Sequence, residues 1–241
     1  MDDSKRRVEV CFSPFSFPLF FDNNSIVVVI DVLRATSAIC TAFHYGAHQV
    51  IPIASIEEAR QYKANGYLTA AERQGEVVEG FELGNSPFSY MNEQIKGKTI
   101  AITTTNGTQA IQVSKNAYKV VLGSFLNLEL LCDFLQTENK NVILLCAGWK
   151  EKFNLEDTLF AGAVVEKLLV SEKFVTSCDS AIASTHLYEL AKPDLLKFLD
   201  NSSHRIRLKN LNLEQDVLYC LSLNLAPVIP ILDRDKLIKL T

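Results

Sequence analysis

The sequence predicts a layered α/β/α fold, with a mostly parallel or mixed sheet and a helical C-terminal part. Short β-branched runs alternate with helical patterns along the 241 residues. Two of the runs, 26–30 and 142–145, are apolar at every position. Strands at the centre of a sheet that is covered on both faces have this pattern, whereas a half-exposed strand alternates.

Eight segments are predicted as strands from their apolar and β-branched content. In chain order they are 8–12, 26–31, 49–54, 68–71, 99–104, 119–123, 141–147 and 228–232. The region 176–224 is expected to be largely helical, and a single strand is expected to close the chain.

Helices are predicted between these strands. Ser55 and Glu58 have the spacing of a capping box at a helix start. A longer helix is expected over 155–170, with Asn154 as its N-cap. Pro193 is suited to the first turn of a further helix.

Composition narrows the classes of protein. Hydrophobic residues make up 48% and charged residues 22%, and the net charge of −4 argues against a nucleic-acid surface. No apolar run is long enough to span a membrane. The six cysteines lack CxxC spacing, which suits reduced thiols in a cytoplasmic protein. Without linkers or repeats, 1–241 is expected to be one integrated unit.

Polar residues gather where predicted strands end, which is where open α/β sheets bind ligands. At the first such end, Asp31 leaves an apolar strand and is followed by Arg34 and Thr36. An acid there can hold a cation or orient a water, and an arginine can grip an oxyanion. The alternative is a structural Asp31–Arg34 pair, with Thr36 or Ser37 as a helix cap.

A second strand end repeats this combination of acid and arginine in Glu72 and Arg73. A long glycine-containing loop follows and includes Asn85 and Ser86. Long shaped loops are often functional, although these two residues could simply form a turn.

The third strand end is the densest, with Thr103, Thr104 and Thr105 followed by Asn106, Gly107 and Thr108. Glycine allows a tight turn and a close ligand approach. The helix expected behind it would aim free N–H groups and a partial positive charge at a bound anion. The alternative is a threonine-rich turn with Thr108 as N-cap.

At the fourth strand end, Trp149 lies in a loop after the strand, and Glu156 and Asp157 open the next helix. The alternative role of these two acids is to compensate the helix macrodipole. Further along, His204 stands beside two arginines and could supply an acid or an anion contact, or belong to a solvated basic turn.

Together, these strand ends predict a crevice that neutralises a polyanion and seats a hard cation such as Mg²⁺, which needs only one or two carboxylates. That combination favours phosphoryl chemistry. The motifs of other phosphatases are missing: Asp31 lacks a second acid two residues on, and Lys152 stands where a Cys146-based phosphatase needs arginine. Cys146 as a nucleophile remains a minor alternative.

The same residues resemble the 2-phosphosulfolactate phosphatase (ComB) family over nearly the whole chain and in the same order. The matching segments are 31–36, 72–73 with 80–87, 104–108, 156–162 and 203–230. The resemblance implies a Mg²⁺-dependent phosphatase with an α/β fold. Such an enzyme converts 2-phospho-3-sulfolactate to 3-sulfolactate and phosphate, a step towards coenzyme M. It also implies a small anionic substrate, with a homodimer as one option and neither nucleic acid nor membrane as a partner.

The resemblance, read with the strand ends, implies three groups of site residues. The catalytic group is Asp31, Arg34, Glu72, Arg73 and Glu156. The substrate- and phosphate-binding group is Thr36, Asn85, Ser86, Thr104, Thr105, Asn106, Gly107, Thr108 and His204. Asp31 and Asp157 are expected to bind Mg²⁺. The alternative function is a protein that binds an anionic metabolite without turning it over, although such a binder gains nothing from acids beside its ligand.

Overall fold

The computed structural model describes residues 5–73 and 75–240. Its strands are β1 (Arg6–Cys11), β2 (Ile26–Ile30), β3 (Gln49–Pro52), β4 (Leu68–Arg73), β5 (Glu76–Val77), β6 (Thr99–Thr103), β7 (Lys119–Gly123), β8 (Val142–Cys146), β9 (Phe174–Val175), β10 (Pro230–Asp233) and β11 (Lys236–Lys239). Its α-helices are α1 (Ala35–His44), α2 (Ile56–Ala64), α3 (Gly107–Ser114), α4 (Leu128–Glu138), α5 (Leu155–Val170), α6 (Asp179–Ala191), α7 (Leu195–Phe198), α8 (Ser203–Asn210) and α9 (Glu214–Cys220).

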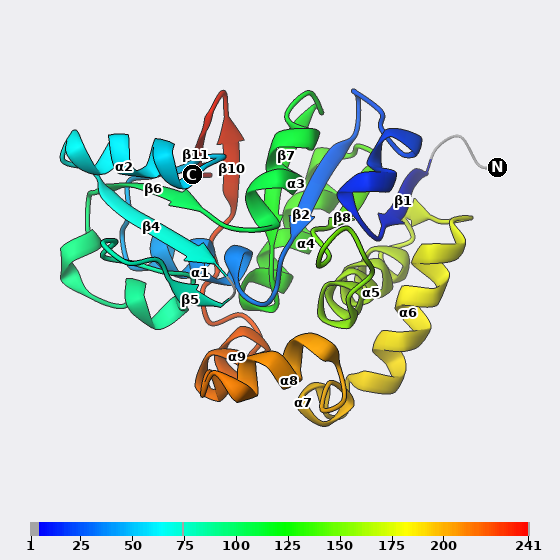
Figure 1. Cartoon of the computed structure of the whole chain (residues 1–241). Helices are drawn as coiled ribbons and strands as arrows, with labels where there is room; N and C mark the ends of the chain where they lie inside the picture. The colour runs from blue at the N-terminus through cyan, green and yellow to red at the C-terminus, as the bar shows by residue number, and fades with distance from the viewer. Residues whose placement is uncertain (1–4, 74, 241) are drawn as a thin grey trace.

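The strands form one mixed sheet with helices on both faces, which confirms the predicted layered α/β class (Figure 1). Within the described residues its order is β5-β4-β6-β3-β11-β10-β7-β2-β8-β1-β9. All eight predicted strands are present, and each of their ends lies within two residues of the predicted one. The predicted helical region near the C-terminus is also confirmed and contains α6 to α9.

The sheet consists of two parallel halves joined by an antiparallel hairpin. One half is β4, β6 and β3, and the other is β7, β2, β8 and β1. The β10–β11 hairpin pairs with β7 through Ile231 and Val121, and with β3 through Leu237 and Val50. In Figure 1 the red hairpin lies between β6 and β7. The prediction that one strand closes the chain is therefore wrong.

Strand β2 shows why the sheet is buried on both faces. Successive side chains of a strand point to opposite faces. Val28 and Ile30 join the core formed with α4 and α5, whereas Val27 and Val29 join a second core with α1 and α3. Each such side chain contributes roughly 1.5–3 kcal/mol when fully buried. This two-sided burial explains the unbroken apolar pattern of the strand.

Local signals at helix starts are confirmed in one case and corrected in another. Ser55 Oγ accepts a hydrogen bond from the amide of Glu58 at 3.1 Å, as the capping box predicts. The helix expected to open at Pro193 begins later, at α7. Asp194 is the N-cap of this helix, and its carboxylate accepts a hydrogen bond from the amide of Lys197 at 3.0 Å. Proline has no side-chain oxygen that could accept such a bond, so Asp194 is the better N-cap residue.

All six cysteines lie in the described part and are free thiols, as predicted. Among the described residues, no helix combines the length and the apolar character needed to cross a membrane.

Candidate active site

A narrow cavity lies where the carboxyl ends of the two half-sheets meet. All four polar strand ends contribute to it, and α8 contributes as well. Its lining includes Asp31, Leu33, Glu72, Asn85, Thr104, Thr105, Asn106, Trp149, His204 and Arg207. The cavity measures about 20 Å³, which is room for the centre of about one water molecule. Seven of the predicted site residues lie in this lining: Asp31, Glu72, Asn85, Thr104, Thr105, Asn106 and His204.

Gly107 allows the start of α3 to pack closely against the end of β2. A Cβ atom at this position would lie 2.8 Å from the Cβ of Ala35 and 3.0 Å from Oδ2 of Asp31. Only glycine lets the start of α3 approach the end of β2 this closely. The close contact found at Gly107 is with the protein's own Asp31 and Ala35, and the close approach of a ligand remains a prediction.

Asp31 is a buried carboxylate among other acids. Its Oδ1 atom faces the amide of Ala35 at 3.5 Å, and its own amide donates to the hydroxyl of Thr36 at 3.2 Å. Burial is the main cause that raises the pKa of Asp31 to about 6, and the charges of Glu72 and Glu156 contribute to the rise. A cation at this point would relieve the repulsion between the acids.

Glu72 and Arg73 lie at the end of β4. Oε1 of Glu72 accepts from the amide of Gly75 at 2.5 Å. The guanidinium of Arg73 donates to the carbonyl of Glu72 at 2.6 Å and to the hydroxyl of Thr103 at 3.1 Å. Arg73 is therefore held by neutral oxygens and keeps its positive charge available to a space that it lines together with Thr104 and Thr105.

Arg34 takes part in a buried ion pair away from the cavity. Its Nη1 atom donates to Oδ2 of Asp216 at 2.5 Å, and Nη2 donates to the carbonyl of Gly75 at 2.6 Å. Ser86 donates to the other oxygen of Asp216 at 3.1 Å. The alternative of an Asp31–Arg34 pair is wrong, since Arg34 pairs with Asp216. The substrate contacts of Arg34 and Ser86 remain predictions.

The threonine loop, residues 103–108, runs from the end of β6 into the first turn of α3. The helix begins at Gly107, so Thr108 lies inside the turn and is not its N-cap. The amide of Thr108 donates to the Thr104 hydroxyl at 3.2 Å, and the Thr108 hydroxyl donates to the Thr104 carbonyl at 3.0 Å. Thr105 is exposed and Asn106 half-buried, and both line the cavity. The loop therefore presents polar groups at a helix start, as an anion site requires.

Asp157 connects the ends of β2 and β8. It is fully buried, and its carboxylate accepts from the amide of Val32 at 2.8 Å, the amide of Gly148 at 3.2 Å and the side chain of Asn154 at 2.9 Å. Desolvation, followed by the charges of Asp31 and Glu156, raises its pKa well above the usual value. Asn154 therefore orients this acid and does not cap α5 with its side chain. Asp157 lies behind the cavity lining, and its role as a Mg²⁺ ligand remains a prediction.

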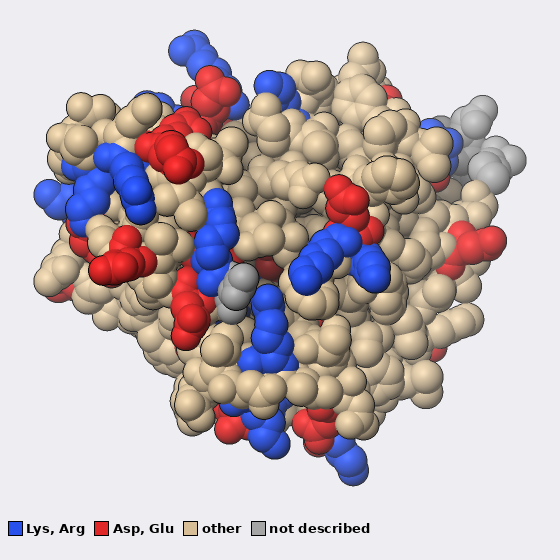
Figure 2. Space-filling model, in the orientation of Figure 1, with Lys and Arg blue, Asp and Glu red and all other residues tan. Residues whose placement is uncertain are grey.

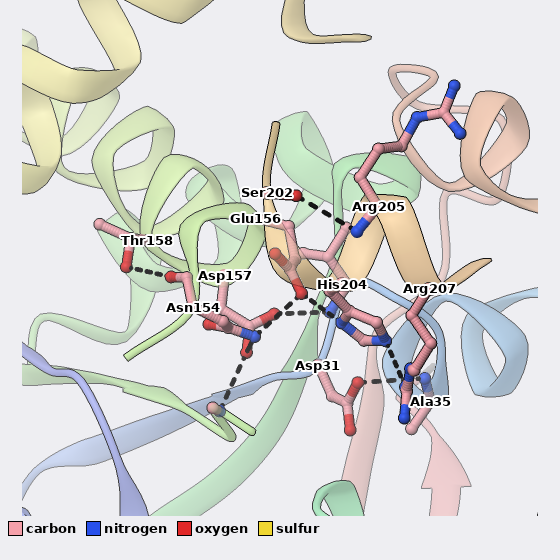
Figure 3. A network of polar contacts seen from close by, with 12 residues as sticks. Asp31, Ala35, Asn154, Glu156, Asp157, Thr158, Ser202, His204, Arg205 and Arg207 are labelled. Carbon is pink, nitrogen blue, oxygen red and sulfur yellow. Dashed lines mark hydrogen bonds and ion pairs between the residues drawn. The ribbon is translucent and has the colours of Figure 1, made fainter. Parts of the chain in front are cut away.

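Glu156, His204 and Arg207 form a chain of contacts that ends at the cavity (Figure 3). Nδ1 of His204 lies 2.5 Å from Oε1 of Glu156, and its Nε2 lies 2.7 Å from Nη2 of Arg207. An arginine can only donate, so Nε2 of His204 accepts and Nδ1 carries the proton to Glu156. In this arrangement His204 links Glu156 to Arg207 and positions the Arg207 guanidinium.

Arg207 and Trp149 line the cavity but are not among the predicted site residues. The Arg207 guanidinium carbon lies 5.3 Å from the centre of the Trp149 ring, and both residues line the cavity. The spacing of His204 and Arg207, three residues apart, was the available signal because such residues share a helix face. Arg205, by contrast, points away from the site (Figure 3).

Cys146 is fully buried at the end of β8, and desolvation raises its pKa well above the usual value. A protonated thiol is a poor nucleophile. If the predicted phosphatase activity is present, the variant Cys146→Ser should retain it to within about two-fold, at a stability cost of about 1–3 kcal/mol for a polar group in an apolar core. Steady-state kinetics on folded protein would check this, and loss of turnover would restore Cys146 as a candidate nucleophile.

Oxygen donors at the cavity fit a hard cation. Asp31 and Glu72 supply carboxylates, and Oδ1 of Asn85 is buried without a hydrogen-bond partner in the described structure. Within residues 5–73 and 75–240, no three His, Cys, Asp or Glu residues are grouped as a metal cage. Mg²⁺ does not need such a cage, since it usually keeps several waters and takes one or two carboxylates.

The fold and the cavity define an α/β protein that gathers acids, basic groups and a helix start around a small cavity. Residues 13–235 match the family model described as 2-phosphosulpholactate phosphatase. The chain belongs to this family, whose named activity is that of a phosphoric monoester hydrolase.

Three relatives illustrate the similarity, and each is named "Probable 2-phosphosulfolactate phosphatase". The protein of Thermotoga maritima is 42% identical over 85% of this chain and 88% of its own. That of Caldanaerobacter subterraneus subsp. tengcongensis is 40% identical over 85% and 86%. That of Clostridium botulinum (strain Eklund 17B / Type B) is 34% identical over 90% and 92%. The family resemblance predicted from the strand-end motifs is thus confirmed.

Proposed function

We propose that this protein hydrolyses 2-phospho-3-sulfolactate to 3-sulfolactate and phosphate with the help of Mg²⁺. The observation that carries the proposal is a single cavity in which Asp31, Glu72 and Asn85 face the Thr104–Asn106 loop. Acids beside an anion site serve a metal-dependent hydrolase and would weaken a simple anion binder. The names of the relatives support the choice of substrate. The free thiols support a cytoplasmic location.

Asp31 would hold the metal, with the oxygens of Glu72 and Asn85 as further donors. Bound Mg²⁺ supplies positive charge to the phosphate oxygens and lowers the pKa of a coordinated water. Asp157 would support these metal-binding residues and would not bind the metal itself. Its carboxylate accepts hydrogen bonds from the amides of Val32 and Gly148, and these bonds fix the ends of β2 and β8 next to the cavity.

The phosphate would lie at the start of α3. The hydroxyls of Thr104 and Thr105, the side chain of Asn106 and the helix N-terminus offer hydrogen bonds to its oxygens, and Arg73 adds charge. Hydrolysis requires a water to attack phosphorus while the bond to the sulfolactate oxygen breaks and that oxygen gains a proton. Glu72 is the acid placed to orient the water, since it lines the cavity and Glu156 does not.

A phosphate-release assay with synthetic 2-phosphosulfolactate tests the proposal. We expect turnover in the presence of Mg²⁺, its loss with EDTA and its return when Mg²⁺ is added in excess. Binding of the substrate without metal-dependent phosphate release would favour the alternative, a protein that only binds the anionic metabolite.

A further inference from the structure

A larger hollow opens beside the narrow cavity. It has a volume of about 880 Å³, and its lining includes Arg73, Thr105, Trp149, Lys150 and Arg207. Thr105, Trp149 and Arg207 line both spaces, so the two are neighbours. The narrow cavity has room for about one water-sized group, whereas the hollow has room for the rest of a small molecule.

The hollow carries positive charge that the protein does not neutralise. Within the described residues, no carboxylate lies within ion-pair distance of Arg73, Lys150 or Arg207. Figure 2 shows Lys and Arg side chains around a hollow near the middle of this face. Three unpaired cations around one concave surface indicate an anionic ligand.

Two of these cations are held against Trp149. The Lys150 ammonium lies 4.6 Å, and the Arg207 guanidinium carbon 5.3 Å, from the centre of its ring. Such cation–π contacts fix a charge without neutralising it. Trp149 and Lys150 lie in a tight turn in which Lys150 and Glu151 have φ of 52° and 62° and the backbones of Trp149 and Lys152 pair. The turn therefore presents the ring and the ammonium together.

Arg207 is also positioned from behind. Nε2 of His204 accepts a hydrogen bond from the Arg207 guanidinium, and Nδ1 of His204 is hydrogen-bonded to Glu156. Two buried residues therefore fix the position of the guanidinium. Its Nε atom is buried and has no hydrogen-bond partner within the described residues. An N–H donor left buried without an acceptor costs free energy.

We infer that Lys150 and Arg207, stacked on Trp149, form the subsite for the sulfonate group of the substrate, separate from the phosphate site at the start of α3. This inference rests on the proposed function, because it assigns part of the same substrate. The subsite makes the protein select phosphate esters that carry a second strong anion and discriminate against those that end in a methyl group.

Calorimetric titration with 3-sulfolactate and with lactate, in buffer containing Mg²⁺, tests the subsite without requiring turnover. Lactate has a methyl group in place of the sulfonate-bearing carbon. We expect the wild-type protein to bind 3-sulfolactate more tightly than lactate. The variant Lys150→Gln should lower the affinity for 3-sulfolactate by about ten-fold and that for lactate by less than about two-fold.

Lys152→Gln is the matched control. Lys152 is exposed, belongs to the same turn and loses the same charge, but it does not line the hollow. Its affinities should equal those of the wild type. Arg207→Gln provides a second variant, with the same selective loss expected for 3-sulfolactate.

Phosphate release from 2-phosphosulfolactate and 2-phospholactate separates this inference from the proposed function. If the wild type releases phosphate but its preference for the sulfonated ester is unchanged in Lys150→Gln and Arg207→Gln, the subsite is wrong and the function stands. If it releases none, yet binds 3-sulfolactate in a way that depends on Lys150, the function is wrong and the subsite stands. Equal affinities of the wild type for 3-sulfolactate and lactate would overturn the subsite.

Discussion

Asp31→Asn should reduce kcat/KM for phosphate release by about a thousand-fold, the scale of losing a main electrostatic contributor at a metal-assisted site. Asparagine has nearly the same shape, so the packing at the end of β2 is retained. The substitution also removes one of the mutually repelling charges of Asp31, Glu72 and Glu156. The thermal midpoint should therefore stay the same or rise while activity is lost.

Kinetics and thermal unfolding of the same preparation would measure both effects. Asp133→Asn, at an exposed position of α4, is the control for loss of one acid and should leave both quantities unchanged. If Asp31→Asn retained more than about a tenth of the wild-type kcat/KM, Asp31 would not be the principal metal-binding acid.

Asp216→Ala should destabilise the protein by about 3–5 kcal/mol, the usual cost of leaving one partner of a buried ion pair uncompensated. Asp216 and Arg34 are each only 4% exposed, and Arg34 also binds the carbonyl of Gly75. Asp216→Ala leaves the guanidinium buried with that carbonyl and without its carboxylate. Urea unfolding monitored by circular dichroism would measure the loss.

The pair of Lys192 and Glu166 gives a matched control, because both side chains are at least partly exposed. Glu166→Gln should cost less than about 1 kcal/mol. The double variant Arg34→Met/Asp216→Leu should recover much of the stability lost in Asp216→Ala, since apolar residues can replace a buried pair. A loss of less than about 1 kcal/mol in Asp216→Ala would show that the pair is not needed for stability.

Local patterns in the sequence were enough to predict the layers and most of the cavity. The unbroken apolar run of β2 indicated two covered faces, and helix α5 begins and ends where its pattern predicted. Of the β10–β11 hairpin, only β10 was predicted. Its second strand, with lysines at both ends and Leu237 and Ile238 between them, is too short and too charged to resemble a buried strand.

Partners from distant parts of the chain could not be predicted from local patterns. Arg34 was assigned to the substrate because an arginine near a strand-end acid suggests an anion contact. Its actual partner, Asp216, lies on α9, and nothing near Arg34 in the sequence identifies it. The same limit applies to Arg207, whose role depends on a contact with Trp149 from another element.

The hairpin between the two half-sheets has a consequence for how the protein reaches its active form. Asp31 and Trp149 belong to one half, whereas Glu72 and Thr104 belong to the other. The strands that join the halves come after both of them in the chain. Long-range pairings of this kind form slowly because they close large loops. A nascent chain that has not reached β11 therefore has both walls of the cavity but lacks the strands that join their sheets, so catalytic competence should appear late in folding.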